Sequence, residues 1–89
     1  MLISNANEEI SRVMYDILEE MTGEVLVRDN PELDLLEDGL LDSLDYVTLQ
    51  LEIEDRFGVL LPPSEYTKEE LNTPGRIISV IAAKRDGAI

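Results

Sequence analysis

Residues 43–58, with the sequence SLDYVTLQLEIEDRFG, decide how this chain folds, because they carry two apolar stripes at helical spacing. Leu44, Val47, Leu51 and Glu54 share one line along the helix, and Tyr46, Leu49, Gln50, Ile53 and Phe57 share the other. Recurrence at three and four residues predicts an amphipathic helix over residues 43–57. Asp45 in its first turn and Gly58 after its last residue agree with the usual signals for a helix start and stop. Two stripes indicate a helix that is contacted on more than one side.

Two further long helices are predicted on either side of this one in the chain. Residues 6–21 carry one apolar stripe and are followed by Gly23; the stripe consists of Ile10, Val13, Met14, Ile17, Leu18 and Met21. Thr73 and Pro74 form an N-cap and first-position pair for the last helix. Its core residues are Ile77, Ile78 and Ile81, and its last turn holds Lys84 and Arg85 before Gly87.

The connections between these helices are also informative. Residues 23–42 form a long loop whose apolar residues are too numerous for a solvated linker: Val25, Leu26, Leu33, Leu35, Leu36, Leu40 and Leu41. We expect this loop to pack across the core, with a short helical turn near residues 33–36. Ser64 is placed to cap a short helix that ends near Leu71. No stretch alternates as a strand does, so the sequence predicts an all-α bundle of three long helices and one short helix.

The composition limits what the chain can do by itself. Its 89 residues suffice for a single domain, which we assign to residues 1–89 with flexible ends at about 1–5 and 86–89. Cysteine and histidine are both absent, which removes thiolate chemistry, the commonest general base and the commonest metal ligand. We therefore expect a protein that is not an enzyme. With no signal-peptide pattern and no long apolar run, a cytoplasmic location is expected.

The charge of the chain is strongly one-sided. Twenty acids against 7 bases give a net charge of −13, which disfavours nucleic acid as a partner and stable insertion into a membrane. Ten of the acids lie between residues 29 and 55, where no base occurs. A window of a single sign indicates a docking surface for a basic protein patch more than it indicates general solubility. We expect the chain itself to be a monomer.

The stretch Gly39-Leu40-Leu41-Asp42-Ser43-Leu44-Asp45 places a serine where a loop meets a helix. By position alone, Ser43 could simply be the N-cap of that helix. Capping does not account for the acids on both sides of it inside a base-free window. Ser43 is therefore a candidate functional residue.

These residues, with Glu54-Asp55-Arg56-Phe57-Gly58 and the turn that contains Pro62, resemble the acyl carrier protein family over roughly residues 8–83. The resemblance implies an acyl-carrier-like helical bundle with a long loop between the first two helices. It also implies that Ser43 receives 4'-phosphopantetheine from coenzyme A, through a separate phosphopantetheinyl transferase that uses magnesium. The thiol of that arm would carry cargo as a thioester. Ser43 itself is a weak nucleophile with no base nearby, so the transferase must supply the activating groups.

The same resemblance implies a partner-binding face at the start and on the exposed side of this helix. It comprises Asp42, Leu44, Asp45, Thr48, Leu51, Glu54 and Asp55. Thr48 departs from the fatty-acid carriers, which usually have an acid there. An alternative for Glu54 and Asp55 is a solvated helix face beside an intrahelical pair of Glu52 with Arg56.

A further set of apolar residues is expected to form ordinary core in preference to a dedicated acyl pocket. The set comprises Tyr46, Val47, Ile53, Phe57, Leu60 and Tyr66.

Residues 30–43 and 72–78 look like the D-alanyl carrier proteins of teichoic acid D-alanylation. Two features depart from that pattern: Leu44-Asp45-Tyr46 after the serine, and Leu71 where those carriers tend to have tryptophan. The mixture resembles a discrete aminoacyl carrier of a macrolactam polyketide pathway, loaded by an adenylating ligase and unloaded by an acyltransferase or synthase. A fatty-acid or polyketide acyl carrier is the alternative, followed by a non-covalent acidic adaptor in which Ser43 only caps a helix.

Calcium binding is a further alternative. Four residues match positions of an EF-hand-like loop, namely Asp34, Asp38, Gly39 and Asp45. Leu36 stands where the loop needs an oxygen ligand, and the final bidentate glutamate is missing, so this alternative is disfavoured.

Overall fold

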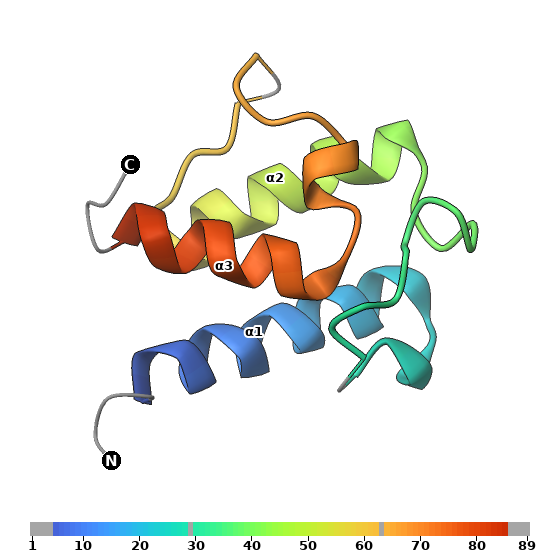
Figure 1. The fold of residues 1–89 in the computed structure, drawn as a ribbon, viewed down its shortest axis with the longest axis horizontal. Helices are drawn as coiled ribbons and strands as arrows, with labels where there is room; N and C mark the ends of the chain where they lie inside the picture. The colour runs from blue at the N-terminus through green and yellow to red at the C-terminus, as the bar shows by residue number, and fades with distance from the viewer. Residues whose placement is uncertain (1–4, 29, 63, 86–89) are drawn as a thin grey trace.

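A computed structural model describes residues 5–28, 30–62 and 64–85 of the chain (Figure 1). These residues form the helices α1 (Asn5–Thr22), α2 (Ser43–Phe57) and α3 (Pro74–Arg85), with short 3₁₀ helices η2 (Val25–Val27) and η3 (Glu69–Leu71). The described ranges contain no strand, and the all-α prediction is confirmed. The expected flexible ends lie outside the described residues except for Asn5, and so does Gly87.

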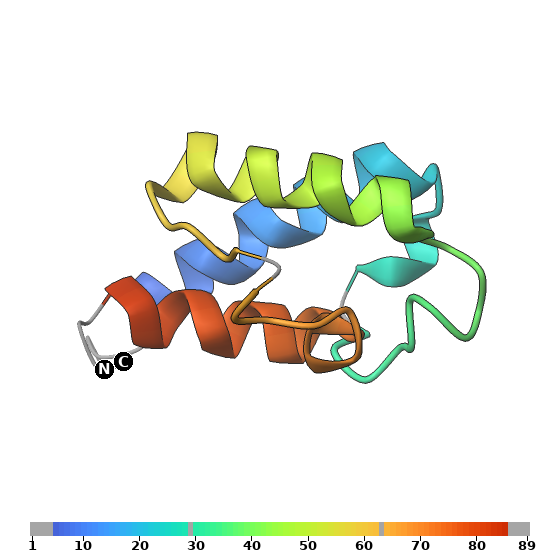
Figure 2. The ribbon, with the colours of Figure 1, turned by 90° about the horizontal axis from the view of Figure 1, so that it is seen from above.

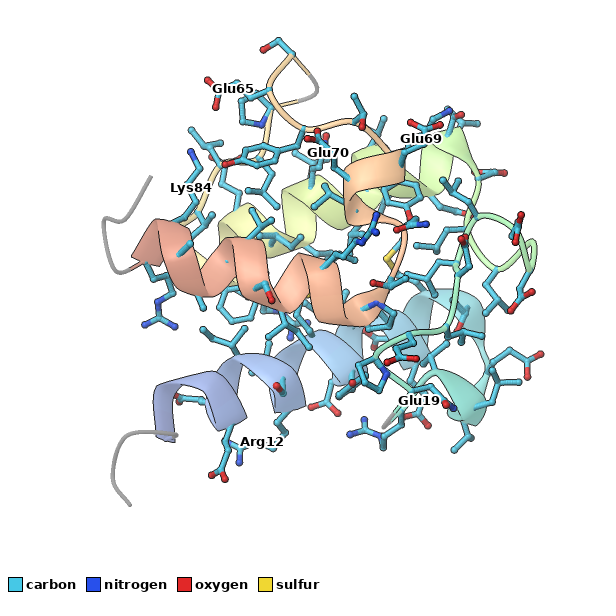
Figure 3. All side chains as sticks on the ribbon, in the orientation of Figure 1. Arg12, Glu19, Glu65, Glu69, Glu70 and Lys84 are labelled. Atoms are coloured by element: carbon cyan, nitrogen blue, oxygen red, sulfur yellow. The ribbon has the colours of Figure 1, made fainter. Side chains whose placement is uncertain are left out.

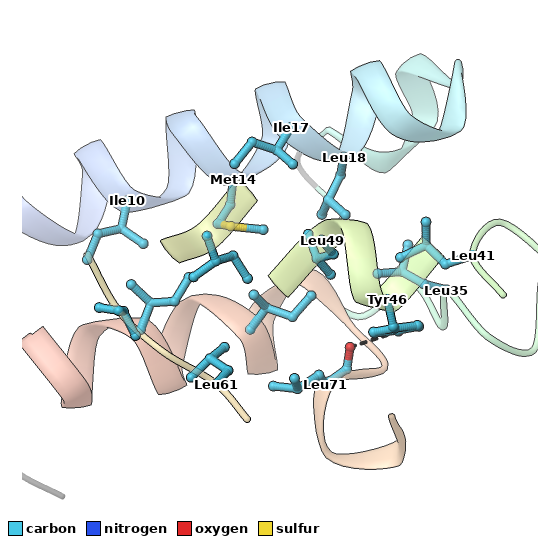
Figure 4. Packing of buried hydrophobic residues seen from close by; sticks show 14 of the residues in the cluster. Ile10, Met14, Ile17, Leu18, Leu35, Leu41, Tyr46, Leu49, Leu61 and Leu71 are labelled. Carbon is cyan, nitrogen blue, oxygen red and sulfur yellow. Dashed lines mark hydrogen bonds between the residues drawn. The ribbon is translucent and has the colours of Figure 1, made fainter. Parts of the chain in front are cut away.

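The three long helices pack side by side in a compact bundle (Figures 1 and 2). Helices α2 and α3 run in the same direction, and α1 runs opposite to both. Helices α1 and α3 direct their apolar stripes inward, and α2 directs inward the line that contains Leu49. Met14 and Leu18 of α1 meet Leu49 in this core (Figure 4), which also contains Ile77 of α3. No charged side chain is buried among the described residues, so the core depends on apolar packing.

The loop between α1 and α2 packs across this core as expected, since Val27, Leu35 and Leu41 are buried. Its helical turn begins at Asp34, whose carbonyl accepts the Asp38 amide at 3.0 Å, so the turn predicted at residues 33–36 is present but lies slightly later. The helix η2 was not predicted. Three residues are too few to show a helical period in the sequence.

The long loop is fastened to the start of α3. The Leu35 amide donates to the carbonyl of Asn72 at 2.7 Å, and the Gly75 amide donates to the carbonyl of Pro31 at 2.9 Å. A Cβ atom at position 75 would lie only 2.9 Å from that Pro31 oxygen, which explains why glycine occupies this position. The loop therefore holds a defined path toward the first residue of α2.

The expected short helix after Ser64 is wrong in extent, since only Glu69–Leu71 is helical. The Pro62 carbonyl accepts the amides of both Glu65 and Tyr66 and so closes a turn. The helical turn is then set up by Thr67, whose hydroxyl accepts the Glu70 amide at 3.2 Å while its own amide donates to the Glu70 carboxylate at 2.8 Å. This reciprocal pair precedes a helix that begins at Glu69, five residues after Ser64.

The last helix begins as predicted. Thr73 accepts the Arg76 amide through its hydroxyl at 3.2 Å, and Pro74 is the first residue of α3. Together with η3, this start places residues 66–71 beside the first turns of α2, where the candidate site lies.

Candidate functional site

The first turn of α2 is closed by two aspartates. Asp42 is the N-cap, and its carboxylate accepts the Asp45 amide at 2.9 Å, while the Asp45 carboxylate accepts the Asp42 amide at 3.0 Å. This reciprocal arrangement is a capping box. The interpretation of Ser43 as the N-cap is therefore wrong, because Asp42 is the N-cap of α2. Ser43 is the first residue of the helix, and its hydroxyl is exposed.

A lysine from a distant part of the chain reaches the Ser43 hydroxyl. The Lys68 ammonium donates a hydrogen bond from Nζ to Ser43 Oγ at 2.8 Å. An ammonium group has no acceptor, so Lys68 cannot take the hydroxyl proton in this arrangement. The site therefore orients Ser43 without activating it. Lys68 was not predicted to be a site residue, although it is the one base between Arg56 and Arg76.

Ser43 lies at the edge of a pocket of about 390 Å³ between α2 and the 66–71 segment. The pocket is lined by Ser43, Tyr46, Val47, Gln50, Tyr66, Thr67, Lys68, Glu69 and Leu71. Its volume falls within the range of small-molecule sites. Figure 3 shows Glu69 at this end of the bundle and Lys84 and Glu65, which pair at 3.9 Å, at the other.

Tyr46 joins the wall of this pocket to the core. Its hydroxyl donates to the Leu71 carbonyl at 2.9 Å, which ties α2 to η3 (Figure 4). Burial raises the pKa of the Tyr46 hydroxyl, and the negative charges of Asp34 and Glu69 raise it further. Tyr46 is therefore a neutral donor at physiological pH.

The prediction that Val47 and Leu60 belong to the core is wrong, because these residues are 53% and 60% exposed. Helices α1 and α3 cover only one side of α2, and Val47 lies on the outward stripe. Tyr46 and Ile53 are buried as predicted, while Phe57 and Tyr66 are half-buried at the edge of the core.

The residues assigned to partner binding occupy the outward side and the first turn of α2. Leu44 and Leu51 are 77% and 62% exposed, which is unusual for leucine. Thr48, Glu54 and Asp55 are also exposed. Asp42 and Asp45 differ from these, because each carboxylate already accepts a backbone amide.

The intrahelical ion pair that was the alternative for the end of α2 is present, since an Arg56 nitrogen lies 3.6 Å from a Glu52 carboxylate oxygen. A shallow groove of about 170 Å³ runs beside this outward side, lined by Val47, Gln50, Leu51, Glu54, Leu60, Leu61 and Pro62. Acids and apolar groups thus share one accessible surface, which we call the outer face of α2.

Two acids of the calcium alternative, Asp34 and Asp45, have other partners. The Asp34 carboxylate accepts the amides of Leu36 and Glu37 and the side-chain amide of Asn72. Within the described ranges, no three acidic side chains come together in a way that could hold a metal ion. The loop is used for capping and for attachment to α3.

The comparisons with known proteins agree with this geometry. Residues 12–81 match the family described as "Phosphopantetheine attachment site". The chain is 39% identical over 71 residues to a D-alanyl carrier protein of Bacillus velezensis, covering 80% of this chain and 91% of that protein. It is 43% identical over 76 residues to one of Lacticaseibacillus rhamnosus (85% and 94% covered) and 35% identical over 74 residues to one of Bacillus subtilis (83% and 95% covered).

The chain therefore belongs to the phosphopantetheine-attachment family of carrier proteins. A member of this family is a carrier and not an enzyme, and a separate transferase attaches 4'-phosphopantetheine to it covalently. The residues present suit that group, since an exposed serine hydroxyl stands beside a pocket and a lysine ammonium. None of the described helices combines the length and the apolar character that crossing a membrane requires.

Proposed function

We propose that Ser43 carries the phosphopantetheine arm and that the chain holds an aminoacyl group as a thioester on its thiol. The observation that carries this proposal is that Asp42, and not Ser43, caps α2. Asp42 caps the helix, so the adjacent Ser43 is exposed and its hydroxyl is not needed for capping when its oxygen is modified. The chain has no cysteine, so the thiol must come from the arm.

The attachment chemistry needs little from the carrier. Ser43 Oγ forms a bond to the phosphorus that bears the pantetheine in coenzyme A, the pyrophosphate bond breaks, and the adenosine bisphosphate half leaves. The hydroxyl proton goes to a base of the transferase, because the carrier has no histidine and Lys68 only donates. Lys68 leaves the O–H bond of Ser43 available to that base.

An aminoacyl cargo is supported by the relatives, which are named D-alanyl carrier proteins. We propose an adenylating ligase as the loading partner and an acyltransferase or synthase as the receiving partner. Each would bring a basic patch to the outer face of α2. Residues 44–46 and Leu71 depart from the D-alanyl pattern, and these departures support a discrete aminoacyl carrier of natural-product biosynthesis over a teichoic acid carrier.

The attachment residue is tested by mass spectrometry after incubation with coenzyme A, magnesium and a broad-specificity phosphopantetheinyl transferase. Wild type should gain the mass of one arm, and Ser43→Ala should gain none. Ser79→Ala is the matched control, since Ser79 is an exposed serine on α3, and it should be modified like wild type. An unmodified wild type under conditions that modify a reference carrier would refute the carrier function.

The cargo is tested separately on the modified protein. Adenylating ligases with a panel of amino acids, D-alanine included, should produce a thioester that hydroxylamine releases. Fatty acyl or malonyl transfer at a higher rate than any aminoacyl transfer would favour the fatty-acid or polyketide alternative.

A further inference from the structure

Unlike three of the other six cations of the chain, Lys68 has no acidic partner among the described residues. Arg28, Arg56 and Lys84 each pair with a carboxylate of the bundle. Among the described residues, no carboxylate lies within salt-bridge distance of Lys68, and its hydrogen bond goes to the neutral Ser43 hydroxyl. The carboxylate of Glu70, two residues further along the chain, accepts the Thr67 amide instead. Within the described part of the chain, Lys68 therefore forms no ion pair at the point where the arm would be attached.

The surroundings of Ser43 make this charge important. Asp42 and Asp45 lie within two residues of it, and Glu69 lines the same pocket. A phosphodiester on Ser43 would carry a negative charge into this acidic surface and be repelled by it. Its non-bridging oxygens are attached to the phosphorus next to Oγ, within reach of an ammonium group 2.8 Å from that oxygen.

We propose that Lys68 is a positioning residue that binds the phosphate of the arm and directs the arm into the pocket between α2 and the 66–71 segment. This inference rests on Ser43 being the attachment residue. Lys68 can donate up to three hydrogen bonds, so it can bind phosphate oxygens while remaining beside Oγ. Without this cation, the arm is pushed away from the acidic surface into solvent.

The pocket matches the chemistry of the arm. Pantetheine has two amides, a hydroxyl and a pair of methyl groups. Gln50 offers a side-chain amide to the amides and hydroxyl, while Val47, Tyr66 and Leu71 offer apolar surface to the methyl groups. A pocket of about 390 Å³ has room for a large part of the arm.

The absence of cysteine makes a direct test possible, because the thiol of the arm is the only thiol in the modified protein. A nitroxide spin label on that thiol broadens the amide NMR signals of residues near it. In wild type, broadening should concentrate at residues 46–50 and 66–69 around the pocket. In Lys68→Gln it should fall about threefold, the effect of losing one exposed ion pair. Lys68→Arg should retain the wild-type pattern.

Lys84→Gln is the matched control, because Lys84 is also a lysine near Tyr66 but lies 5.6 Å from its ring and pairs with Glu65. It should leave the broadening unchanged. About 0.5 M salt shortens the screening length to a few ångströms and should weaken the wild-type pattern without any substitution. Apo spectra of each variant establish that the fold is intact.

Equal broadening in wild type and Lys68→Gln, or a wild-type pattern spread over all surfaces and insensitive to salt, would overturn the positioning role. Mass spectrometry of the same samples separates the two proposals. A wild type without the arm refutes both, whereas a modified wild type whose label ignores the pocket refutes only the role of Lys68.

Discussion

The two sides of α2 are built from similar residues but have opposite surroundings. On the inner side, Leu49 and Ile53 are fully buried in the core shared with α1 and α3. On the outer face, Leu44 and Leu51 are mostly exposed. All four are large and aliphatic, so residue type does not distinguish the two sides. Their positions relative to the other helices do.

The buried residues of α2 hold the helix in the bundle, whereas its exposed residues form a surface that is accessible to other molecules. Burial of a leucine or isoleucine side chain contributes roughly 1.5–3 kcal/mol, so the inner side can fix α2 by itself. The outer leucines stabilise the folded chain little and expose apolar surface next to acids. Such a surface is typical of a site for a protein partner. The following predictions test this separation, from the largest effect to the smallest.

Matched leucine-to-alanine substitutions give the largest contrast. Leu49→Ala leaves a cavity in the core and should lower the free energy of unfolding by about 3 kcal/mol. Leu51→Ala, on the same helix, should change it by less than about 0.5 kcal/mol. Urea unfolding measures both. Should Leu49→Ala prove too unstable to measure, Ile53→Val should still cost about 1 kcal/mol. Similar losses at Leu49 and Leu51 would show that the two sides are not distinct.

Tyr46 tests the link between the inner side and the pocket. Tyr46→Phe removes the hydrogen bond to Leu71 and leaves a buried carbonyl unpaired, so it should cost about 1.5 kcal/mol in urea unfolding at neutral pH. The effect should depend on pH. Burial raises the pKa of Tyr46, so above about pH 10 an unfolded tyrosine loses its proton while the folded one retains it.

Stability due to Tyr46 is therefore present below pH 10 and is lost as the pH rises further, by up to about 1.4 kcal/mol per pH unit. The difference in unfolding free energy between wild type and Tyr46→Phe isolates this contribution from the other titrating groups. The difference should shrink between pH 9 and 11, and a constant difference would contradict the contribution of the Tyr46 pKa to stability.

The start of α2 gives an intermediate contrast between neighbouring residues. Asp42→Ala removes the N-cap and should cost about 1 kcal/mol of unfolding free energy, while Asp42→Ser should recover most of it. Ser43→Ala should change stability by less than about 0.5 kcal/mol yet abolish modification. If Ser43→Ala were the more destabilising change, Ser43 would have a structural role after all.

The bounds of α2 could be predicted because local signals define both ends. The apolar period covers the whole helix, and Gly58 adopts a left-handed backbone with φ of 69° after Phe57. The cap could not be predicted in the same way. Asp42 and Ser43 are adjacent and both are good caps, so only the backbone geometry decides between them.

The exposure of Val47 and Leu60 could not be predicted because it depends on what covers α2. A period shows which residues share a line along a helix, but it does not show which line faces α1 and α3. The contact of Lys68 with Ser43 is harder still. It joins residues 25 positions apart, and it depends on the path of the chain through Pro62 and on the turn at Thr67.

The smallest effects concern the acids of the outer face. Glu52 pairs with Arg56 at 3.6 Å, whereas Glu54 has no cation within salt-bridge distance among the described residues and lines the groove beside Leu51. Glu52→Gln should cost a few tenths of a kcal/mol. Glu54→Gln should be neutral or slightly stabilising, because the chain has a net charge of −13 and loses one repelling acid. High salt should reduce both differences in thermal unfolding.

For partner binding, Glu54→Gln should have a larger effect than Glu52→Gln if the outer face is the docking surface, which is the reverse of their order for stability. A loading ligase with a basic patch should bind Glu54→Gln about two- to fivefold more weakly than wild type, with the loss mainly in the association rate at low salt. Glu52→Gln should bind nearly as wild type, because that carboxylate is already engaged with Arg56. Stopped-flow association at two salt concentrations measures both variants. Equal binding by Glu54→Gln and wild type would move the docking surface away from this groove and leave its exposed leucines without a partner.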